Sequence, residues 1–319
     1  MNHSCARRRL AALAAAALLS LGLAAPAAAA DLPGQGTRVQ PIKSSLPEEA
    51  FQTLLVSRAL AKLGYEVQPV KDLEPATAHV AIANGDGTFM ANHWNPLQAE
   101  FFTNAGGDAR LHRKGVYSDN AAQGYLIDRK TAEQHGITDL GQLKDPKVGK
   151  LFDTDGDGKA DLTGCNPGWG CELAIERHLD AFGLRGAITH KQGSYAALIA
   201  DTIARYKQGK PILYYTWTPY WVSAVLRPGQ DVVWLQVPSS PDSKTRLPNG
   251  KDYGFQVNRQ HIVASKAFTD AHPAAARLFE VMQLPVAGIN AQNLRMSRGE
   301  NKPGDIGRHT DAWVRAHQK

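Results

Sequence analysis

Three tryptophans stand in short segments of proline, glycine and small polar residues. Trp94 lies in His-Trp-Asn-Pro, Trp169 in Pro-Gly-Trp-Gly and Trp217 in Tyr-Thr-Trp-Thr-Pro. Each follows a strand-like run, and in open α/β sheets ligands bind beyond the carboxyl ends of the strands. Three such rings would form an aromatic cage that suits a quaternary ammonium, because π faces attract a cation that cannot donate hydrogen bonds. For any one tryptophan alone, packing in the core is the better explanation.

An acidic loop, residues 153–161, is a second group of candidate ligands. Asp153, Asp155, Asp157 and Asp161 match positions 1, 3, 5 and 9 of a calcium loop that also has glycine at position 6. Position 12, where a bidentate glutamate belongs, is Gly164. The loop therefore predicts either a weak structural calcium site or a tight connection of Asx turns and glycines.

Signatures of common enzyme classes are missing from the sequence. It contains no HExxH, no GxSxG, no Walker A loop and no GxGxxG after a strand. The eleven histidines are scattered along the chain. These observations favour a binding protein over an enzyme.

Residues 1–30 have the composition of a secretory signal peptide. Arg7–Arg9 precede an apolar run, Leu10–Leu23, and Ala28–Ala30 fit a cleavage site that places the mature start at Asp31 or one residue earlier. The apolar run is short of the ~20 residues that span a membrane. The mature protein is therefore expected to be exported and soluble.

Export determines how the cysteines are interpreted. Cys165 and Cys171 are the two cysteines downstream of the signal peptide, and an even pair in an oxidising compartment predicts a disulfide. Oxidation would also remove Cys171 as a thiolate nucleophile. Closing so small a ring contributes only about 2 kcal/mol in the chain-entropy model. The bond is expected to fix the local shape of the loop that holds Trp169.

Charge and length exclude some partners. Cleavage after residue 30 would lower the formal net charge from +6 to +3, because the segment holds three arginines and no acidic residue. The remaining charges are well mixed, which argues against nucleic acid or an anionic membrane as a partner. The mature chain is long enough to form two lobes.

Short strand-like runs alternate with helical patterns, which indicates an α/β protein with mainly parallel sheets. One helix is expected to start at a capping box, Ser45-x-x-Glu48, and to stop at Gly64. Further helices are expected at residues 173–183, 194–207 and 273–283. Strands are expected at residues 39–42, 65–70, 79–83, 124–128, 211–216, 232–237 and 261–264, and a surface loop at 238–250.

The mature chain contains six distinctive segments: FQTLLVSRALAKLGYEV, AAQGYLID, LFDTDGDGKADLTGCNPGWGCE, YYTWTPYWVS, DVVWLQVP and MQLPVAGINAQN. Together they resemble the periplasmic glycine betaine/proline betaine-binding proteins of osmoprotectant ABC importers, over essentially the whole mature chain. The resemblance implies a type II periplasmic-binding-protein fold, in which two α/β lobes enclose the ligand. Lobe 1 would comprise residues 31–123 and 262–319, and lobe 2 residues 124–261.

The resemblance also implies a binding site. Trp94 from lobe 1, with Trp169 and Trp217 from lobe 2, would surround a trimethylammonium group. The ligand carboxylate would be held by the backbone N–H groups of Gly170 and Cys171 and by the side chain at position 98. The family pattern has histidine there, whereas this chain has Gln98, which donates an N–H but brings no positive charge.

Three functions compete at this point. The leading one is a monomer that captures glycine betaine or proline betaine and delivers it to membrane permease subunits, with no cofactor required and no nucleic-acid partner. The second is a secreted enzyme acting on a choline-like or betaine-like amine, which would need a general base, metal centre or cofactor site beside the cage. The third is a calcium-stabilised exoprotein, which would show repeats of the acidic loop, and the chain has one copy.

Overall fold

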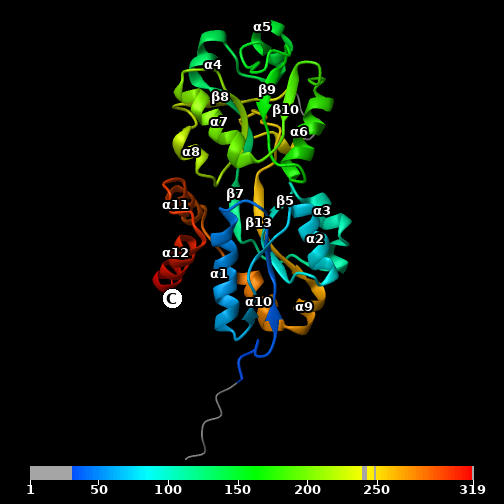
Figure 1. The fold of residues 1–319 in the computed structure, drawn as a ribbon. Helices are drawn as coiled ribbons and strands as arrows, with labels where there is room; N and C mark the ends of the chain where they lie inside the picture. The colour runs from blue at the N-terminus through cyan, green and yellow to red at the C-terminus, as the bar shows by residue number, and fades with distance from the viewer. Residues whose placement is uncertain (1–30, 239–242, 248, 318–319) are drawn as a thin grey trace, which may run out of the picture. The chain divides into compact units, whose positions relative to one another are not determined.

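The computed structural model describes residues 31–238, 243–247 and 249–317. The predicted signal peptide, residues 1–30, and five residues of the predicted surface loop lie outside this part of the chain. From residue 33 onward, the described residues form one unit, and their strands form two separate large sheets, each with its own helices (Figure 1). The helices in the described part of the chain are each too short or too polar to span a bilayer.

Lobe 1 is built on a mixed sheet with helices on both faces. The strand order is β4-β2-β5-β13-β6, and β7 also pairs with β13. On β5, Phe89 and Ala91 pack with residues of α1, whereas Met90 packs with residues of α2. This alternation follows from the two-residue period of a strand, and it buries both faces of β5.

The strands of lobe 1 are β1 (Arg38–Val39), β2 (Pro41–Lys43), β3 (Glu66–Val67), β4 (Lys71–Asp72), β5 (Phe89–Asn95), β6 (Leu111–His112), β7 (Ser118–Ala121) and β13 (Asn258–Ser265). Its helices are α1 (Glu49–Lys62), α2 (Pro75–Asn84), α3 (Ala99–Asn104), α9 (Lys266–Ala271), α10 (Pro273–Val281), α11 (Val286–Ser297) and α12 (Pro303–Ala316), with a 3-10 turn, η1 (Gly107–Ala109). The short strands β1 and β3 pair with each other in parallel.

Lobe 2 is built on a second mixed sheet, in the order β10-β9-β11-β8-β12. Its strands are β8 (Gln123–Asp128), β9 (Ala160–Thr163), β10 (Ile188–Lys191), β11 (Leu213–Trp217) and β12 (Val232–Leu235). Its helices are α4 (Arg129–His135), α5 (Pro146–Gly149), α6 (Gly170–Ala181), α7 (Tyr195–Lys207) and α8 (Val222–Val225), with the 3-10 turns η2 (Leu140–Lys144) and η3 (Ser243–Thr245). Every residue of β8 is buried, as expected of a central strand.

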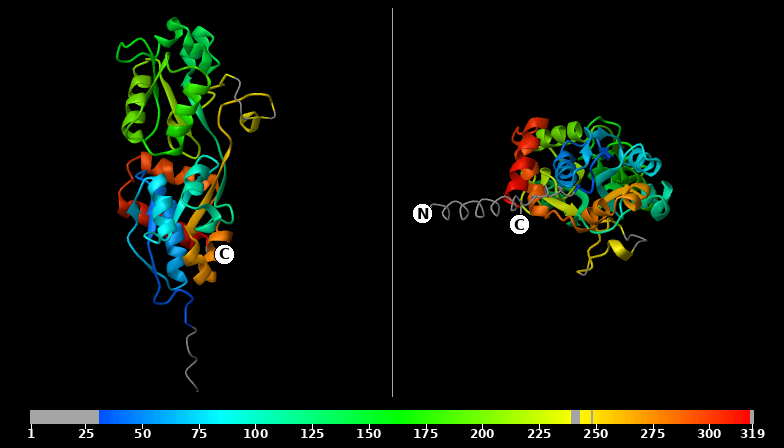
Figure 2. Two further views of the ribbon diagram at one scale, coloured as in Figure 1. Left: turned by 90° about the vertical axis from the view of Figure 1, so that its right-hand side faces the viewer. Right: turned by 90° about the horizontal axis from the view of Figure 1, so that it is seen from below.

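The chain crosses between the two sheets twice. It leaves lobe 1 at the end of β7, Ala121, and enters β8 at Gln123; it returns to lobe 1 in β13, which starts at Asn258. The two crossing segments run side by side, because β7 pairs with β13 (Figure 1, Figure 2). The lobe boundaries predicted from the sequence, 123/124 and 261/262, fall at the first residue of β8 and inside β13.

The prediction of mainly parallel sheets is wrong. In lobe 1, β13 pairs antiparallel with β5, β6 and β7, and in lobe 2, β8 pairs antiparallel with β11 and β12. Both of these strands follow a crossover from the other lobe. The βαβ rule that predicts parallel pairing applies to consecutive strands within one sheet, and these two strands do not satisfy it.

Residues 79–83, predicted as a strand, lie in the helix α2. The helix has Pro75 at its first turn and ends at Gly85, whose φ of 88° is a left-handed C-cap. Short apolar runs fit a buried strand or a buried helix equally well. The real strand of this region, β5, was missed because its buried residues include Asn92 and His93, which are fully buried and polar.

The capping box predicted at Ser45 and Glu48 is also wrong. Glu48 is the N-cap of α1, and no side chain caps the helix there. Instead, the carboxylate of Glu49 accepts a hydrogen bond from the N–H of Ser44, with Oε2 at 2.8 Å. The stop at Gly64 is confirmed, since α1 ends at Lys62 and Gly64 has a φ of 90°.

Candidate functional site

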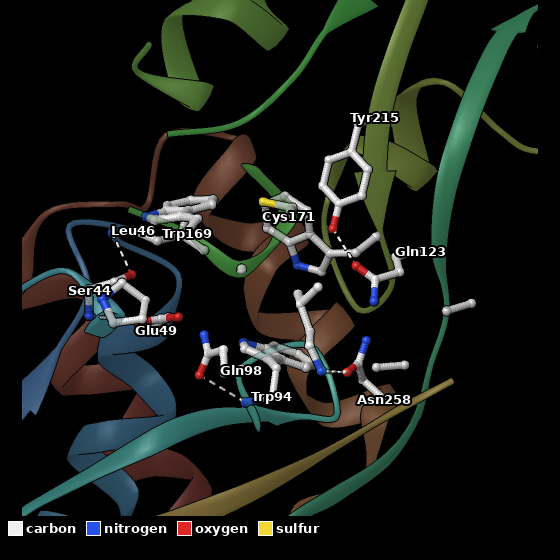
Figure 3. A pocket seen from close by; sticks show the side chains of 16 residues that line it. Ser44, Leu46, Glu49, Trp94, Gln98, Gln123, Trp169, Cys171, Tyr215 and Asn258 are labelled. Atoms are coloured by element: carbon white, nitrogen blue, oxygen red, sulfur yellow. Dashed lines mark hydrogen bonds between the residues drawn. The ribbon is translucent and has the colours of Figure 1, made fainter. Parts of the chain in front are cut away.

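The six residues predicted to hold a ligand line one cavity between the lobes (Figure 3). Trp94 and Gln98 come from lobe 1, and the other four from lobe 2: Trp169, Gly170, Cys171 and Trp217. Ten lining residues were not predicted: Ser44, Leu46, Glu49, Pro75, Leu97, Ala121, Ala122, Gln123, Tyr215 and Asn258. Of these, Tyr215 could have been found, because it belongs to the same aromatic segment as Trp217.

The tryptophan rings are placed by the ends of regular elements. Trp94 is the last residue but one of β5, Trp217 ends β11, and Trp169 is the N-cap of α6. The rings of Trp169 and Trp217 meet edge to face, with centroids 5.9 Å apart. Trp217 stacks on Tyr220 at 4.5 Å. These contacts within lobe 2 restrain both tryptophan rings before a ligand binds, which lowers the entropy cost of ordering them.

The loop between Cys165 and Cys171, which holds Trp169, leads directly into α6. The structure contains the predicted Cys165–Cys171 disulfide, and α6 begins at Gly170, three residues earlier than predicted. The first N–H groups of a helix have no acceptor in a preceding turn. Within the described part of the chain, neither Gly170 nor Cys171 donates a backbone hydrogen bond. Two free donors therefore lie at the positive end of the helix dipole, where an anion is favoured.

We expect the disulfide to matter more for affinity than for stability. Replacing both Cys165 and Cys171 with alanine should cost about 2 kcal/mol of folding free energy, since the ring is small. The loop would no longer hold Trp169 and the two N–H donors in place, so the affinity for the ligand should fall about tenfold or more. Calorimetric titration and thermal melting of the same variant compare the two effects. A lower melting temperature with unchanged affinity would contradict this expectation.

Gln98 is oriented by a neighbour in the cage. The residue is 4% exposed, and its Oε1 accepts a hydrogen bond from the backbone N–H of Trp94 at 3.1 Å. Because this bond assigns the oxygen, the amide nitrogen faces the cavity as a donor (Figure 3). The side chain thus presents a hydrogen-bond donor in the same cavity as the N–H groups of Gly170 and Cys171.

Glu49 brings a carboxyl group into the cavity wall. One of its oxygens accepts the N–H of Ser44, and the side chain points into the cavity (Figure 3). Burial raises the pKa of Glu49 to about 7, although the hydrogen bonds from Ser44 oppose that shift. From the sequence, only its neighbour Glu48 was expected to have a role, in the capping box, and Glu49 was not predicted.

Hydrogen bonds and an ion pair join the lobes around the cavity. Trp169 Nε1 donates to Glu74 Oε2 at 2.6 Å, and Asn166 donates to Ser45 at 3.4 Å. Farther out, Arg177 pairs with Glu100 at 3.3 Å, and both side chains are well exposed. The two lobes are therefore in direct contact at the cavity rim.

Two fully buried histidines support the lobe 1 side of the cavity. His79 Nδ1 lies 2.6 Å from the carbonyl oxygen of Pro75, His79 Nε2 lies 2.8 Å from His93 Nδ1, and His93 Nε2 lies 3.0 Å from Arg113 Nη1. A carbonyl only accepts and a guanidinium only donates. Both rings are therefore neutral, and each donates through Nδ1 and accepts through Nε2. The chain of bonds ties the first turn of α2 to β5, which carries Trp94.

This network should make stability depend on acid pH. Burial lowers the pKa of His79 to about 4, and the charge of Arg113 contributes; burial and the neighbouring His79, Arg113 and His261 also lower the pKa of His93. Unfolded histidine protonates near pH 6.5, so stability is full above that pH and is lost as the pH falls toward 4.

Between pH 6.5 and 4, the unfolding free energy of His79→Gln should fall by up to about 3 kcal/mol less than that of wild type, because glutamine does not titrate. Urea denaturation of wild type and variant at pH 4.5, 5.5 and 6.5 measures it. Equal slopes of unfolding free energy against pH in the two proteins would show that His79 does not titrate as argued.

The acidic loop is paired with a lysine of the same chain, Lys191. Carboxylate oxygens of Asp153, Asp155 and Asp161 lie within 4.8 Å of one another. The Lys191 ammonium bonds to Asp155 and pairs with Asp161 at 3.0 Å. Among the described residues, Asp157 is not part of the group; it accepts the N–H of Lys159. The sequence did not indicate Lys191, which reaches the loop from the neighbouring strand β10.

Comparison with known proteins gives one family. The family model that describes the substrate-binding domain of ABC-type glycine betaine transport systems matches residues 37–316 of this sequence. The glycine betaine/proline betaine-binding periplasmic protein of Escherichia coli is 59% identical over 296 residues, which cover 91% of this chain and 90% of that protein. The glycine betaine-binding periplasmic protein of Dickeya dadantii is 58% identical over 315 residues, covering 97% and 94%.

Solved structures show the same fold at low sequence identity. A choline-binding protein of an ABC transporter, in complex with choline, superposes with a TM-score of 0.70 at 18% identity, over 88% of this chain and 89% of that one. The lactococcal glycine betaine-binding protein, in its closed form with glycine betaine, gives a TM-score of 0.67 at 18% identity, over 88% and 96%. The predicted two-lobed fold is thereby confirmed.

Proposed function

This chain belongs to the family of substrate-binding domains of ABC-type glycine betaine transport systems, and on that premise we propose that it captures glycine betaine or proline betaine for import. The observation that supports the ligand is the composition of the cavity. Three tryptophan rings and the N–H donors of Gly170, Cys171 and Gln98, which have no acceptor among the described residues, line the same space. A zwitterion matches both sets: its quaternary ammonium suits the rings, and its carboxylate suits the N–H donors, which we call the anion half of the site.

In the proposed complex, the trimethylammonium group lies against the faces of Trp94, Trp169 and Trp217. Each ring contributes ~0.5–2 kcal/mol, and each charge-assisted hydrogen bond to the carboxylate contributes ~1.5–3 kcal/mol. The entropy of association offsets part of this sum, so affinity near the micromolar range, about −8 kcal/mol, is expected. Since the ring of Trp94 and the Gln98 amide belong to lobe 1, the full set assembles only when the lobes meet.

We propose that the protein acts in the periplasm as a monomer, passes its ligand to the permease subunits of an ABC importer, and is not an enzyme. The relatives named above are periplasmic binding proteins. The alternative, an enzyme acting on a quaternary amine, needs a general base at the cage. Glu49 is the carboxylate nearest to that description, because burial raises its pKa to about 7, but one of its oxygens already accepts the N–H of Ser44.

A ligand panel tests this proposal. Calorimetric titrations with glycine betaine, proline betaine, choline and carnitine should show the two betaines binding most tightly. Choline has the same cationic group without a carboxylate, so it should bind at least about tenfold more weakly, having lost the charge-assisted hydrogen bonds. Equal affinities for choline and glycine betaine would contradict the anion half of the site.

We also propose that Lys191 neutralises the acidic loop in place of calcium. Lys191→Met should destabilise the fold by about 1–3 kcal/mol, because it leaves Asp161, whose side chain is 4% exposed, without its ion-pair partner. In wild type, the melting temperature should be the same with calcium chloride and with a chelator. A lower melting temperature in chelator would instead indicate a bound calcium ion. Lys159→Met, in the same loop, is the matched control.

A further inference from the structure

The side chain of Glu74 bonds to a ring of the cage instead of capping its own helix. Glu74 is the N-cap of α2, but its carboxylate makes no capping bond there. It accepts the indole N–H of Trp169 from the other lobe, at 2.6 Å. Indole has one donor and no acceptor, so this contact satisfies the whole hydrogen-bonding capacity of the ring.

A proline and a disulfide-closed loop flank Glu74 on the two sides of that bond. Pro75, the next residue, lines the cavity, and its carbonyl accepts from the buried His79. From lobe 2, the disulfide-closed loop approaches closely: a Cβ placed on Gly168 would lie 3.8 Å from Glu74 Cβ. The carboxylate is therefore held where the indole edge arrives when the lobes meet.

We propose that Glu74 is a positioning residue of the cage, which fixes the Trp169 ring as the lobes close and strengthens its attraction for a quaternary cation. This inference rests on the proposed function. The bond joins two lobes, so it forms only on closure and links closure to the orientation of the ring. A carboxylate on the indole N–H also polarises the ring, and a more negative π face binds a cation more strongly.

Another contact between the lobes supplies the matched control. Glu100 also bridges the lobes, through Arg177, but both of those side chains are more than half exposed. Among the described residues, Glu100 is not part of the cavity lining. A contact that merely holds the lobes together would behave like this pair. Exposed ion pairs contribute little, so Glu100→Gln should change the affinity by less than about twofold.

The experiment compares Glu74→Leu, Glu74→Gln and Glu100→Gln with wild type, using glycine betaine as the probe. Dissociation constants come from calorimetry, and association and dissociation rates from stopped-flow tryptophan fluorescence. We expect Glu74→Leu to weaken binding about tenfold, mainly through faster dissociation, because the bond forms after encounter. Glu74→Gln keeps an oxygen acceptor but loses the charge, so it should restore part of the loss, to about threefold.

The possible outcomes separate this inference from the proposed function. If wild type binds glycine betaine and Glu74→Leu binds within twofold of it, the inference is overturned alone. The same holds if Glu74→Gln is no better than Glu74→Leu. If wild type does not bind glycine betaine, the proposed function and this inference both fail. Thermal melting without ligand confirms that each variant is folded, and the conservative glutamine variant serves if the leucine variant is not.

Discussion

Replacing Gly170 with alanine should weaken glycine betaine binding by about ten- to a hundredfold and leave the stability of the ligand-free protein nearly unchanged. A Cβ at this position would lie 2.7 Å from the carbonyl oxygen of Leu97 and 2.8 Å from its Cγ. Leu97 belongs to lobe 1 and Gly170 to lobe 2, and a backbone oxygen cannot rotate away. Such overpacking costs about 1–3 kcal/mol, which corresponds to the expected loss of affinity.

The effect should be confined to the closed state, because the clash exists only where the lobes meet. Alanine is also a better helix former than glycine, so α6 itself is not weakened. Calorimetry gives the affinity, and thermal melting without ligand gives the stability. Gly186→Ala is the matched control, since a Cβ there meets no atom within 4 Å. Wild-type affinity in Gly170→Ala would mean that the lobes do not meet at this residue in the complex.

Replacing Trp217 with alanine should weaken binding by at least about tenfold. The change removes one wall of the cage, worth ~0.5–2 kcal/mol in cation–π attraction, together with the apolar area that the ligand would bury. Trp217→Phe keeps a smaller π face and should lose less. Affinities are measured by calorimetry with glycine betaine.

Trp313 provides the control for that experiment. It lies in α12, stacks on His317 with ring centroids 4.1 Å apart, and is not part of the cavity lining. Trp313→Ala should therefore lower the melting temperature without changing the affinity. If both alanine variants reduce the affinity equally, the loss reflects general destabilisation and the cage assignment of Trp217 is wrong.

The aromatic part of the candidate site could be predicted from the residues themselves, whereas Gly170, Cys171 and Gln98 were predicted only from the resemblance to a family. Trp169 stands between two glycines, and Trp94 and Trp217 each stand two residues before a proline. Core packing could explain any one of these rings, but it is a poorer explanation for all three together. The cysteine pair marked the loop that holds one of them. These signals are local in the sequence, and the structure brings all three rings into one cavity.

Residues that act across the chain could not be predicted. Glu74 precedes a proline at the start of a helix, a position typical of an ordinary N-cap, and its partner Trp169 is 95 residues away. Lys191 reaches the acidic loop only because β9 and β10 pair in parallel. The antiparallel pairing of β13 likewise depends on the return of the chain from the other lobe. In each case the deciding contact is tertiary, and no pattern within either segment specifies it.

The central claim is that the aromatic cage recognises a quaternary ammonium. The most direct test is a pair of calorimetric titrations of the wild-type protein, one with glycine betaine and one with glycine. The two ligands share the carboxylate and the positive charge and differ in the three methyl groups. The account predicts that glycine binds at least about a hundredfold more weakly, because its ammonium must give up hydrogen bonds to water that the ring faces do not replace. Equal affinities for the two ligands would contradict it.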